Sequence, residues 1–595
     1  IAVVVSAEAK PLDWKLLDAA GKTVASGKTV PAGKDLSSGD PIHYADFSSF
    51  AKEGKGYVLS VGEASSFPFT ISKGLYAPLE KDAMAYFYRS RIGIPLEAKY
   101  AGDAWARPAF FISDEAVKAA DYPVFPQKDY VYRPYTLNAG KGWMDAGDYG
   151  KYVVNGGITL WTLMNAFERN PRLFPDGSLS MAENANGVPD ILDEARWELE
   201  FFLGMQVPEG MSDSGMVHHK LHEKKWLPLP YKALERTDDR YAMRPSTAAT
   251  LNFSAATAQA SRVFATYDKA FADRCLAASE RAFAAAVAHP AVLFYYVPDD
   301  GGGDYDDAKV ADEFFWAACE LYLATGKTEY RDRVEKSVAS REYYAVLSDA
   351  NGPMYWGGTA GLGMLSLLSK KSDLNPATLK TIRGWLIAGA DRYLAQERDE
   401  GYRAPFFEYQ WGSNSSVLNK AIVLAYAYDL TGKAQYRDGV SSCLDYVLGR
   451  NALCKSFVSG YGSYPMFYPH HRWWADDPDA GYPPPPPGVL SGGPNAKPSD
   501  EAASFLEKKV APAKRYADDA RSYSTNEVAI NWNAPLAWTV SWLDSTMNPD
   551  SPSRAKRGMG AGGGLALLFV SVLVIVGLAS AAIAIASRRG KTKAK

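Results

Sequence analysis

Two aspartates in the stretch 142–152 (GWMDAGDYGKY) have the spacing of a catalytic pair. Asp145 and Asp148 are separated only by Ala146 and Gly147, so a tight loop can bring both carboxylates to one point. Neighbouring carboxylates raise one another's affinity for a proton, which suits one of them to act as a base on water. Taken alone, however, a D-x-x-D motif is more often an ordinary acidic turn.

A third carboxylate, Glu527, lies in a more apolar stretch. Its neighbours include Val528 and Ile530, and apolar surroundings raise the pKa of a carboxyl group and keep it protonated. The alternative is a glutamate at a helix start capped by Thr525 or Asn526, which is a common arrangement. Together with the two aspartates, Glu527 supplies the base and the acid that hydrolysis of a glycosidic bond requires.

The elements that must position these carboxylates change in kind along the chain. Residues 1–78 contain short apolar stretches separated by Ala-Gly and Ser-Gly turns, which predicts a small antiparallel β-sandwich. The pattern becomes helical over residues 79–547; in 186–205, for example, apolar residues recur at helical spacing after Pro189. We therefore expect a sandwich followed by a helical domain that carries all three carboxylates.

One internal similarity indicates a repeated helical hairpin. The segments 321–334 (LYLATGKTEYRDRV) and 427–440 (AYDLTGKAQYRDGV) share a helix end, a Thr-Gly-Lys turn and a Tyr-Arg-Asp restart. Glycine commonly provides the left-handed residue that ends a helix. Two copies 106 positions apart predict an array of helical hairpins, although common helix-ending chemistry also explains the likeness.

Composition narrows the functional classes. The formal net charge is only −3, so no overall field recruits nucleic acid or anionic lipid. The chain has 15 Trp and 36 Tyr; such rings suit the faces of sugars, but they also fill large cores. The four cysteines form no C-x-x-C pair and no Cys/His cluster with zinc spacing. Cys443 and Cys454 are near enough in sequence to bridge, which separation alone does not decide.

Two stretches interrupt the helical pattern. Residues 464–497 include five consecutive prolines at 483–487, which exclude helix and favour an extended polyproline conformation. Loops of this length in compact domains are usually functional or disordered, and the His, Arg and Trp content of this one favours function. Residues 548–564 read as a linker.

The C-terminal part predicts a membrane anchor. Residues 565–586 form a run of 22 positions without a charged residue, which as a helix is roughly 33 Å long and spans the hydrocarbon core of a bilayer. The tail 587–595 is basic and is therefore expected in the cytoplasm, with everything before the span outside the cell. Three basic residues on the other flank, within 554–557, weaken this orientation.

The motifs around the carboxylates resemble those of glycoside hydrolase family 9. The stretch from Tyr516 fits one family signature through Asp518, Tyr523 and Glu527 to Asn533-Ala534. The blocks DAGDYGKY, NGVPDILDEA and ADEFFWAACELYLATG are also similar, and so is SFVSGYGSYPMFYPHHR, except at Tyr464, where Asn, Lys or Arg is usual. The first 78 residues resemble the immunoglobulin-like domain found before many family 9 catalytic domains. The resemblance covers about residues 1–545.

This resemblance implies a multidomain fold: an N-terminal immunoglobulin-like β-sandwich, then an all-α (α/α)6 barrel, to which we add the C-terminal transmembrane helix. It implies an inverting hydrolase in which Asp148 is the general base and Asp145 its partner in holding the attacking water. Glu527 is then the general acid that protonates the leaving oxygen.

The resemblance also implies residues that contact substrate. His470 and Arg472 match substrate-contacting positions of the family signature, and His219 lies where the family often has a cleft histidine, although a packed histidine is nearly as good an explanation. Trp473 and Trp474 follow the signature and either stack on glucosyl rings or only brace the proline-rich loop. Trp411 and Tyr523 complete the predicted substrate-binding set.

Metal sites of the family are only partly matched. The Cys/His set that binds zinc in some relatives is absent around residues 109–122. Asp312 and Glu313 match an Asp-Glu pair that often binds calcium, but the aspartate expected near Trp356 is Gly357. No cofactor is required by the predicted chemistry, and calcium is left open.

The leading hypothesis is an endo-acting β-1,4-glucanase whose partner is a β-glucan polysaccharide, displayed outside the cell on a single membrane span, with no nucleic-acid partner. One alternative is an exo-acting enzyme of the same fold, a cellobiohydrolase or an exo-glucosaminidase. Another is a catalytically dead, membrane-displayed glycan-binding protein, against which the presence of all three carboxylates argues.

Overall fold

The computed structural model describes residues 1–119, 135–211, 213–233, 240–295, 300–405, 408–477 and 479–554. Residues 1–553 form one compact unit, which contains the sandwich and the helical domain. The linker beyond 554, the predicted span 565–586 and the basic tail lie outside the described residues.

The N-terminal domain is the predicted antiparallel β-sandwich. In β2 and β6 every second side chain is buried, the alternation expected of strands with one face on a core. Trp14, Leu16 and Leu59 form the centre of that core. One sheet has the order β1-β5-β4 and the other β3-β2-β6-β7, with β8 also paired to β6. The strands are β1 (Ala2–Val5), β2 (Asp13–Leu17), β3 (Thr23–Lys28), β4 (Val30–Lys34), β5 (Pro41–Ala45), β6 (Gly54–Val61), β7 (Ala64–Ser65) and β8 (Phe69–Ile71).

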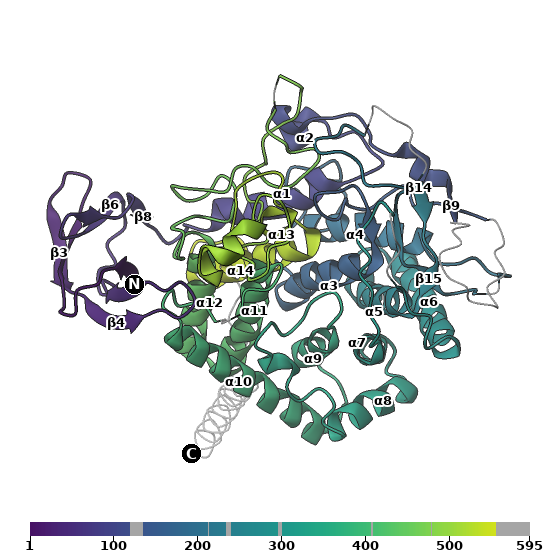
Figure 1. Ribbon diagram of the computed structural model, residues 1–595. Helices are drawn as coiled ribbons and strands as arrows, with labels where there is room; N and C mark the ends of the chain where they lie inside the picture. The colour runs from purple at the N-terminus through teal and green to yellow at the C-terminus, as the bar shows by residue number, and fades with distance from the viewer. Residues whose placement is uncertain are drawn as a thin grey trace, which may run out of the picture. The chain divides into compact units, whose positions relative to one another are not determined.

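The second domain is the expected all-α barrel. Six helices are buried along most of their length and lie at the centre, and six others surround them (Figure 1). The central helices are α3 (Val153–Arg169), α5 (Thr247–Phe264), α7 (Ala311–Thr325), α9 (Ala360–Ser369), α11 (Ser413–Thr431) and α14 (Ile530–Met547). The surrounding helices are α1 (Ala77–Ser90), α4 (Asp190–Gly204), α6 (Lys269–Ala288), α8 (Thr328–Ala339), α10 (Pro376–Asp399) and α12 (Ala434–Val447).

The packing order follows the chain. Helix α14 packs on α3, α3 on α5, α5 on α7 and α7 on α9, while α11 packs on α14. The surrounding helices show the apolar stripe of a half-buried helix: in α12, Tyr436, Val440 and Cys443 face the core at helical spacing. The repeated hairpin is confirmed, because Gly326 ends α7 and Gly432 ends α11 in the left-handed conformation, with φ of 67° and 68°.

The helical domain also contains short helices and short strands. The short helices are α2 (Ala98–Ala101) and α13 (Tyr523–Asn526). A sheet of order β10-β9-β14-β13-β11 places β11 beside β13. Its strands, and those of the pair β12-β15, are β9 (Val117–Ala119), β10 (Thr136–Leu137), β11 (Lys151–Tyr152), β12 (Val217–His218), β13 (Lys220–Glu223), β14 (Arg240–Ala242) and β15 (Pro245–Ser246).

The sandwich is attached to the barrel through polar contacts. Asp40 accepts a hydrogen bond from Tyr402 at 2.7 Å and forms an ion pair with Lys514 at 2.6 Å. The N–H of Gly401 donates to Asp35 at 3.0 Å. Two of these contacts hold Gly401 and Tyr402, which precede the loop that leads into α11.

The fold prediction needs one correction, at its C-terminal end. No helix within residues 1–554, as far as they are described, is both long enough and apolar enough to cross a membrane. The predicted span 565–586 lies outside the described residues. The transmembrane helix is therefore not part of the described fold, and the extracellular location stays a prediction. The question of a disulfide is resolved, because Cys443 and Cys454 are both free thiols.

Candidate active site

The candidate site is a cleft of about 1160 Å³ built from the loops that lead into the central helices. Residues just before α3, α7, α9, α11 and α14 all line it. The barrel topology thus gathers segments that are hundreds of positions apart. Since the N-terminus of a helix carries partial positive charge, this end of the barrel also favours carboxylates and other acceptors. The side chains that represent these five loops are Tyr152, Tyr305, Tyr355, Trp411 and Glu527.

The loop 145–150 folds back on itself and brings its two aspartates together as predicted. The N–H of Asp145 donates to the carbonyl of Gly150 at 2.9 Å, and the N–H of Ile530 donates to the carbonyl of Asp145 at 2.8 Å. Gly147 must be glycine, because a Cβ there would lie 2.4 Å from the carbonyl oxygen of His470. This close approach places the loop against the segment that carries Glu527.

Gly147 joins the two halves of the site. Its N–H donates to Oε1 of Glu527 at 3.3 Å, and its carbonyl accepts from the backbone N–H of Arg472 at 3.0 Å and from Nη1 of Arg472 at 2.9 Å. The other guanidinium donors of Arg472 bind the carbonyl of Leu227. Arg472 lines the cleft, but its hydrogen bonds show that it also fixes the catalytic loop.

The loop rests on buried ion pairs. Lys151 pairs with Asp114 at 2.8 Å, and Arg240 pairs with Asp114 at 3.0 Å and with Glu223 at 2.7 Å. Arg240 also donates to the carbonyl of Tyr149 within the loop. One member of this charged layer, Asp114, lies within residues 109–122, where the sequence has no Cys/His set.

Asp145 is completely buried, and both of its oxygens accept hydrogen bonds. Nδ2 of Asn155 lies 3.0 and 2.8 Å from its two oxygens, and the hydroxyl of Tyr305 donates at 2.9 Å. Burial, together with the charge of Asp148, raises the pKa of Asp145 to about 8 in spite of these donors. The protonation of Asp145 therefore responds to the charge of its neighbour near neutral pH.

Asp148 and Glu527 are held differently. The hydroxyl of Tyr152 donates to Oδ2 of Asp148 at 2.6 Å. Burial and the charges of Asp148 and Asp145 raise the pKa of Glu527 well above its usual range. Glu527 therefore holds a proton at neutral pH, as a general acid must, and Asp148 is left as the carboxylate suited to accept one.

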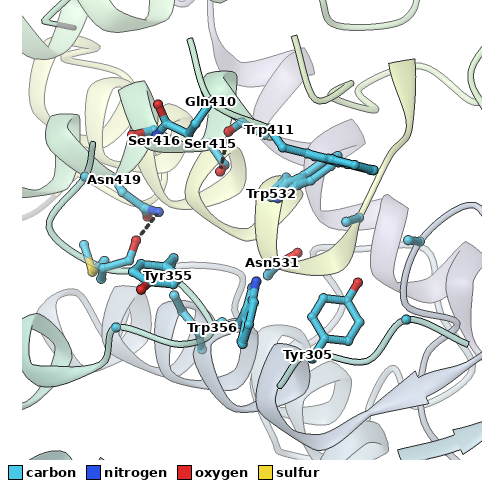
Figure 2. A pocket seen from close by; sticks show the side chains of 18 of the residues that line it. Tyr305, Tyr355, Trp356, Gln410, Trp411, Ser415, Ser416, Asn419, Asn531 and Trp532 are labelled. Carbon is cyan, nitrogen blue, oxygen red and sulfur yellow. Dashed lines mark hydrogen bonds between the residues drawn. The ribbon is translucent and has the colours of Figure 1, made fainter. Parts of the chain in front are cut away.

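Two rows of rings flank these carboxylates. The base-side row is Tyr355, Trp356, Tyr305 and Tyr152, with successive centroids 5.9, 5.3 and 4.8 Å apart, and it ends at Asp148. The acid-side row is Trp411, Tyr523 and His470, with centroids 5.8 and 5.9 Å apart. It ends where the backbone of His470 runs beside Glu527. Figure 2 shows Trp411 with Trp532 on one side of the pocket and Tyr355, Trp356 and Tyr305 on the other.

The predicted substrate contacts are brought together only in part. His470, Arg472, Trp411 and Tyr523 line the cleft. His470 is neutral at physiological pH, because burial lowers its pKa to about 4, and its Nδ1 donates to the carbonyl of Ala520 at 2.6 Å. The remaining ring nitrogen, Nε2, can therefore accept a hydrogen bond.

Three predicted contacts need correction. His219 is fully buried, stacks on Phe294 at 4.1 Å and bonds Ser246 at 2.8 Å, so it is a packed histidine. Trp473 and Trp474 are only 7% and 0% exposed and do not line the cleft. Their rings pack against buried aromatic side chains. They therefore brace the segment beyond 472, as the alternative explanation held.

Several residues of the cleft lining, and the buried Asn155 that bonds Asp145, were not predicted from the sequence. Asn155 is hidden inside a helix, and Tyr305 follows an uninformative Gly-rich turn. The backbone of Tyr305 has a φ of 49°, a left-handed conformation that is unfavourable for a large side chain and often marks a functional position. Beyond its high aromatic content, the sequence did not indicate a cleft position for Trp226, Trp356 and Trp532.

The predicted calcium ligands do not assemble a metal site as placed. Oδ2 of Asp312 accepts the N–H of Thr359 at 2.7 Å at the start of α7. Within the described part of the chain, no group of three or more His, Cys, Asp or Glu side chains has the arrangement to hold a metal ion. Calcium binding by Asp312 and Glu313 stays a prediction, and no chemical step below uses it.

Comparison with known proteins agrees with this site. The profile of glycosyl hydrolase family 9 matches residues 76–540, and that of the cellulase N-terminal ig-like domain matches residues 1–66. The chain is 44% identical over 91% of its length to a cellulose 1,4-beta-cellobiosidase of Acetivibrio thermocellus. It is 41% identical over 91% of its length to endoglucanase C of Cellulomonas fimi. The chain spans 65% and 50% of the lengths of these two relatives.

Solved structures show the same architecture. A family 9 protein of Bacteroides ovatus superposes with a TM-score of 0.78 at 33% identity, covering 91% of this chain and 95% of that one. The family 9 endoglucanase J30 superposes with a TM-score of 0.82 at 29% identity, covering 91% and 97%. The resemblance drawn from the sequence motifs is confirmed.

Proposed function

Because the chain belongs to glycosyl hydrolase family 9, we propose that it is an inverting hydrolase of β-1,4-glucosidic bonds in cellulose or related β-glucans. The observation that supports this most strongly is the arrangement around Gly147. One loop carries Asp148 and binds Glu527 through its backbone N–H, so that a base and a protonated acid share one open cleft. Inverting hydrolysis needs these two groups on opposite sides of the scissile bond.

The proposed reaction proceeds in one displacement. Glu527 donates its proton to the leaving glycosidic oxygen, while Asp148 removes a proton from a water molecule that attacks the anomeric carbon from the opposite face. Asp145, held by Asn155 and Tyr305, positions that water beside Asp148. The two rows of rings suit the flat faces of consecutive glucosyl units, and the amides near them suit their hydroxyl groups.

An endo mode is the first choice. Both rows present an exposed ring to the cleft, Tyr355 at 54% and Trp411 at 47% exposure, so each wall offers a flat surface on which sugar rings of a polymer can stack. A long chain can then lie across the site. The relative from Cellulomonas fimi that bears the name endoglucanase C is 41% identical over 91% of this chain, which supports the endo mode.

An exo mode is the second candidate, since the relative from Acetivibrio thermocellus that is 44% identical bears the name of a cellobiosidase. The two modes are separated by following viscosity and reducing ends together on carboxymethylcellulose. An endo enzyme thins the solution early, before much sugar is released. Steady sugar release with slow thinning would favour the exo mode.

The proposed activity is tested by assaying reducing-end release from barley β-glucan with the parent protein and Glu527→Gln. The matched control is Glu329→Gln, which removes an exposed carboxylate on α8 far from the cleft lining. We expect hydrolysis by the parent and the control and almost none by Glu527→Gln. Equal rates for all three proteins would refute the assignment, and no turnover of any β-glycan by the parent would favour a binding protein.

A further inference from the structure

Asp148 presents its two carboxylate oxygens to different surroundings. Oδ2 accepts the hydroxyl of Tyr152 at 2.6 Å and the N–H of Gly150 at 3.3 Å. No hydrogen bond from the described residues reaches Oδ1. By contrast, both oxygens of Asp145 accept donors. The carboxylate that faces the reaction therefore has one anchored oxygen and one free oxygen.

Tyr152 is itself held rigidly. Its side chain is 1% exposed, and its hydroxyl accepts the N–H of Gly303 at 3.0 Å. A Cβ at Gly150 or at Gly302 would lie 2.5 or 2.6 Å from that hydroxyl. Both positions thus leave room for nothing larger than glycine beside it, and the phenol oxygen has little freedom to move.

A buried ion pair holds Gly303, the residue whose N–H donates to the hydroxyl of Tyr152. Lys220 donates to the carbonyl of Gly303 at 2.8 Å and pairs with Asp300 at 2.9 Å. The lysine is completely buried and the aspartate is 5% exposed. His222 stacks parallel to the ring of Tyr152 at 6.4 Å. The chain of contacts runs from the ion pair through Gly303 and Tyr152 to Oδ2 of Asp148.

We propose that Tyr152 is a positioning residue that selects Oδ1 of Asp148 as the oxygen that takes the proton from water. This proposal rests on the proposed hydrolysis. By anchoring Oδ2, Tyr152 fixes the plane of the carboxylate and leaves one oxygen to face the attacking water. Its hydrogen bond also holds Asp148 in the orientation in which Oδ1 can act as the base.

Tyr152 can fill this role across the working pH range. Burial and the charge of Asp148 raise the pKa of its phenol well above the usual value, so it remains a donor. Other ionisable groups interact electrostatically with Asp148 from several elements around it. They are Asp145, Lys220, Glu223, Tyr305, His470 and Glu527.

The test is Tyr152→Phe, which keeps the ring and removes the hydroxyl. We expect kcat on a soluble β-glucan to fall by about 10- to 100-fold with little change in KM, because a charge-assisted hydrogen bond is lost. The acidic limb of the kcat/KM profile should move to higher pH by about one to two pH units, since the charged base has lost a donor. The alkaline limb should stay in place.

The matched control is Tyr436→Phe. Tyr436 is a buried tyrosine that donates to Asp391 at 2.8 Å between α12 and α10, away from the cleft. This variant loses the same kind of bond and should keep the parent pH profile. If Tyr152→Phe lowered the rate without moving the acidic limb, Tyr152 would have only a structural role and the proposal would be wrong.

A second substitution covers the case in which Tyr152→Phe does not fold. Replacing Tyr152 with 3-fluorotyrosine keeps the shape and makes the phenol a stronger donor, so the acidic limb should move to lower pH. An unchanged limb would overturn the proposal. Active parent protein with an unmoved limb refutes only the role of Tyr152, whereas a parent that hydrolyses no β-glucan refutes the proposed function and this inference together.

Discussion

The two rows of rings in the cleft differ in what they are attached to. The base-side row ends in side chains that bond the carboxylates directly: Tyr305 to Asp145 and Tyr152 to Asp148. The acid-side row contacts Glu527 only through the backbone of His470, and its ring Trp411 is 47% exposed. The base-side row therefore orients reacting groups at its buried end, although its outer ring, Tyr355, is 54% exposed. The rings of the acid-side row make no side-chain hydrogen bond to a catalytic carboxylate within the described structure and are free to bind substrate.

This difference between the rows predicts which substitutions lower kcat and which raise KM. Groups bonded to a catalytic carboxylate act in the transition state, so their loss lowers kcat. An exposed ring that stacks on sugar contributes equally before and during the reaction, so its loss raises KM.

The largest effect is expected for the acid and the base themselves. Asp148→Asn and Glu527→Gln should each lower kcat by about 10²- to 10⁴-fold, because proton transfer to and from the reacting atoms is removed. Both variants should keep the parent circular dichroism spectrum and melting cooperativity. A variant with more than a tenth of parental kcat would contradict the role given to that residue.

The second largest effect is expected at Gly147, which contacts both the segment of Arg472 and Glu527. Gly147→Ala would push a methyl group against the carbonyl of His470, 2.4 Å away, and should cost about 1–3 kcal/mol of unfolding free energy together with most of the activity. Gly384→Ala on α10, where nothing lies within 4 Å, should instead stabilise the fold by about 0.5–1 kcal/mol. Denaturant unfolding measures both. Equal effects at the two glycines would show that the close approach is not needed.

The electrostatics of the carboxylates predict a pH effect of intermediate size. Protonated Glu527 is the active form, so the alkaline limb of the rate profile falls as pH rises through its raised pKa. Asp145→Asn removes a negative neighbour, which lowers that pKa, so the alkaline limb should move to lower pH. The rate should also fall, though less than for Asp148→Asn. An alkaline limb that stays in place or moves upward would argue against this coupling.

The smallest effect belongs to the acid-side row. Trp411→Ala should raise KM by about two- to tenfold with kcat nearly unchanged, because one stacking contact of about 0.5–1.5 kcal/mol is lost. Phe505→Ala, which removes an exposed ring outside the cleft lining, is the control and should change neither constant. A large loss of kcat in Trp411→Ala would erase the distinction between the rows.

The sequence predicted most of the fold because its signals were local and repeated. Short stretches of residues are enough to predict the alternating burial in β6 and the glycines that end α7 and α11. The catalytic loop was also visible, since Asp145 and Asp148 are neighbours in the chain. The roles of these residues remain proposals, but the structure shows that Asp148 and Glu527 line one cleft and that Asp145 is buried near them.

The parts that were not predicted depend on contacts between distant segments. Burial decides whether Trp473, Trp474 and His219 bind sugar or fill a core, and no local pattern reports it. Tyr152 was part of a recognised motif, yet its bond to Asp148 depends on how β11 turns into α3. Tyr305 reaches Asp145 from 160 positions away. Such residues are identified only once the barrel has gathered the loops.

The central claim, one displacement with Asp148 as base and Glu527 as acid, is tested most directly by the stereochemistry of the product. Hydrolysis of a soluble cello-oligosaccharide in an NMR tube shows which anomer forms first, before mutarotation mixes the two. If the reaction is a single displacement, the new reducing end appears as the α-anomer and only later equilibrates. First appearance of the β-anomer would mean retention through a covalent intermediate and would contradict it.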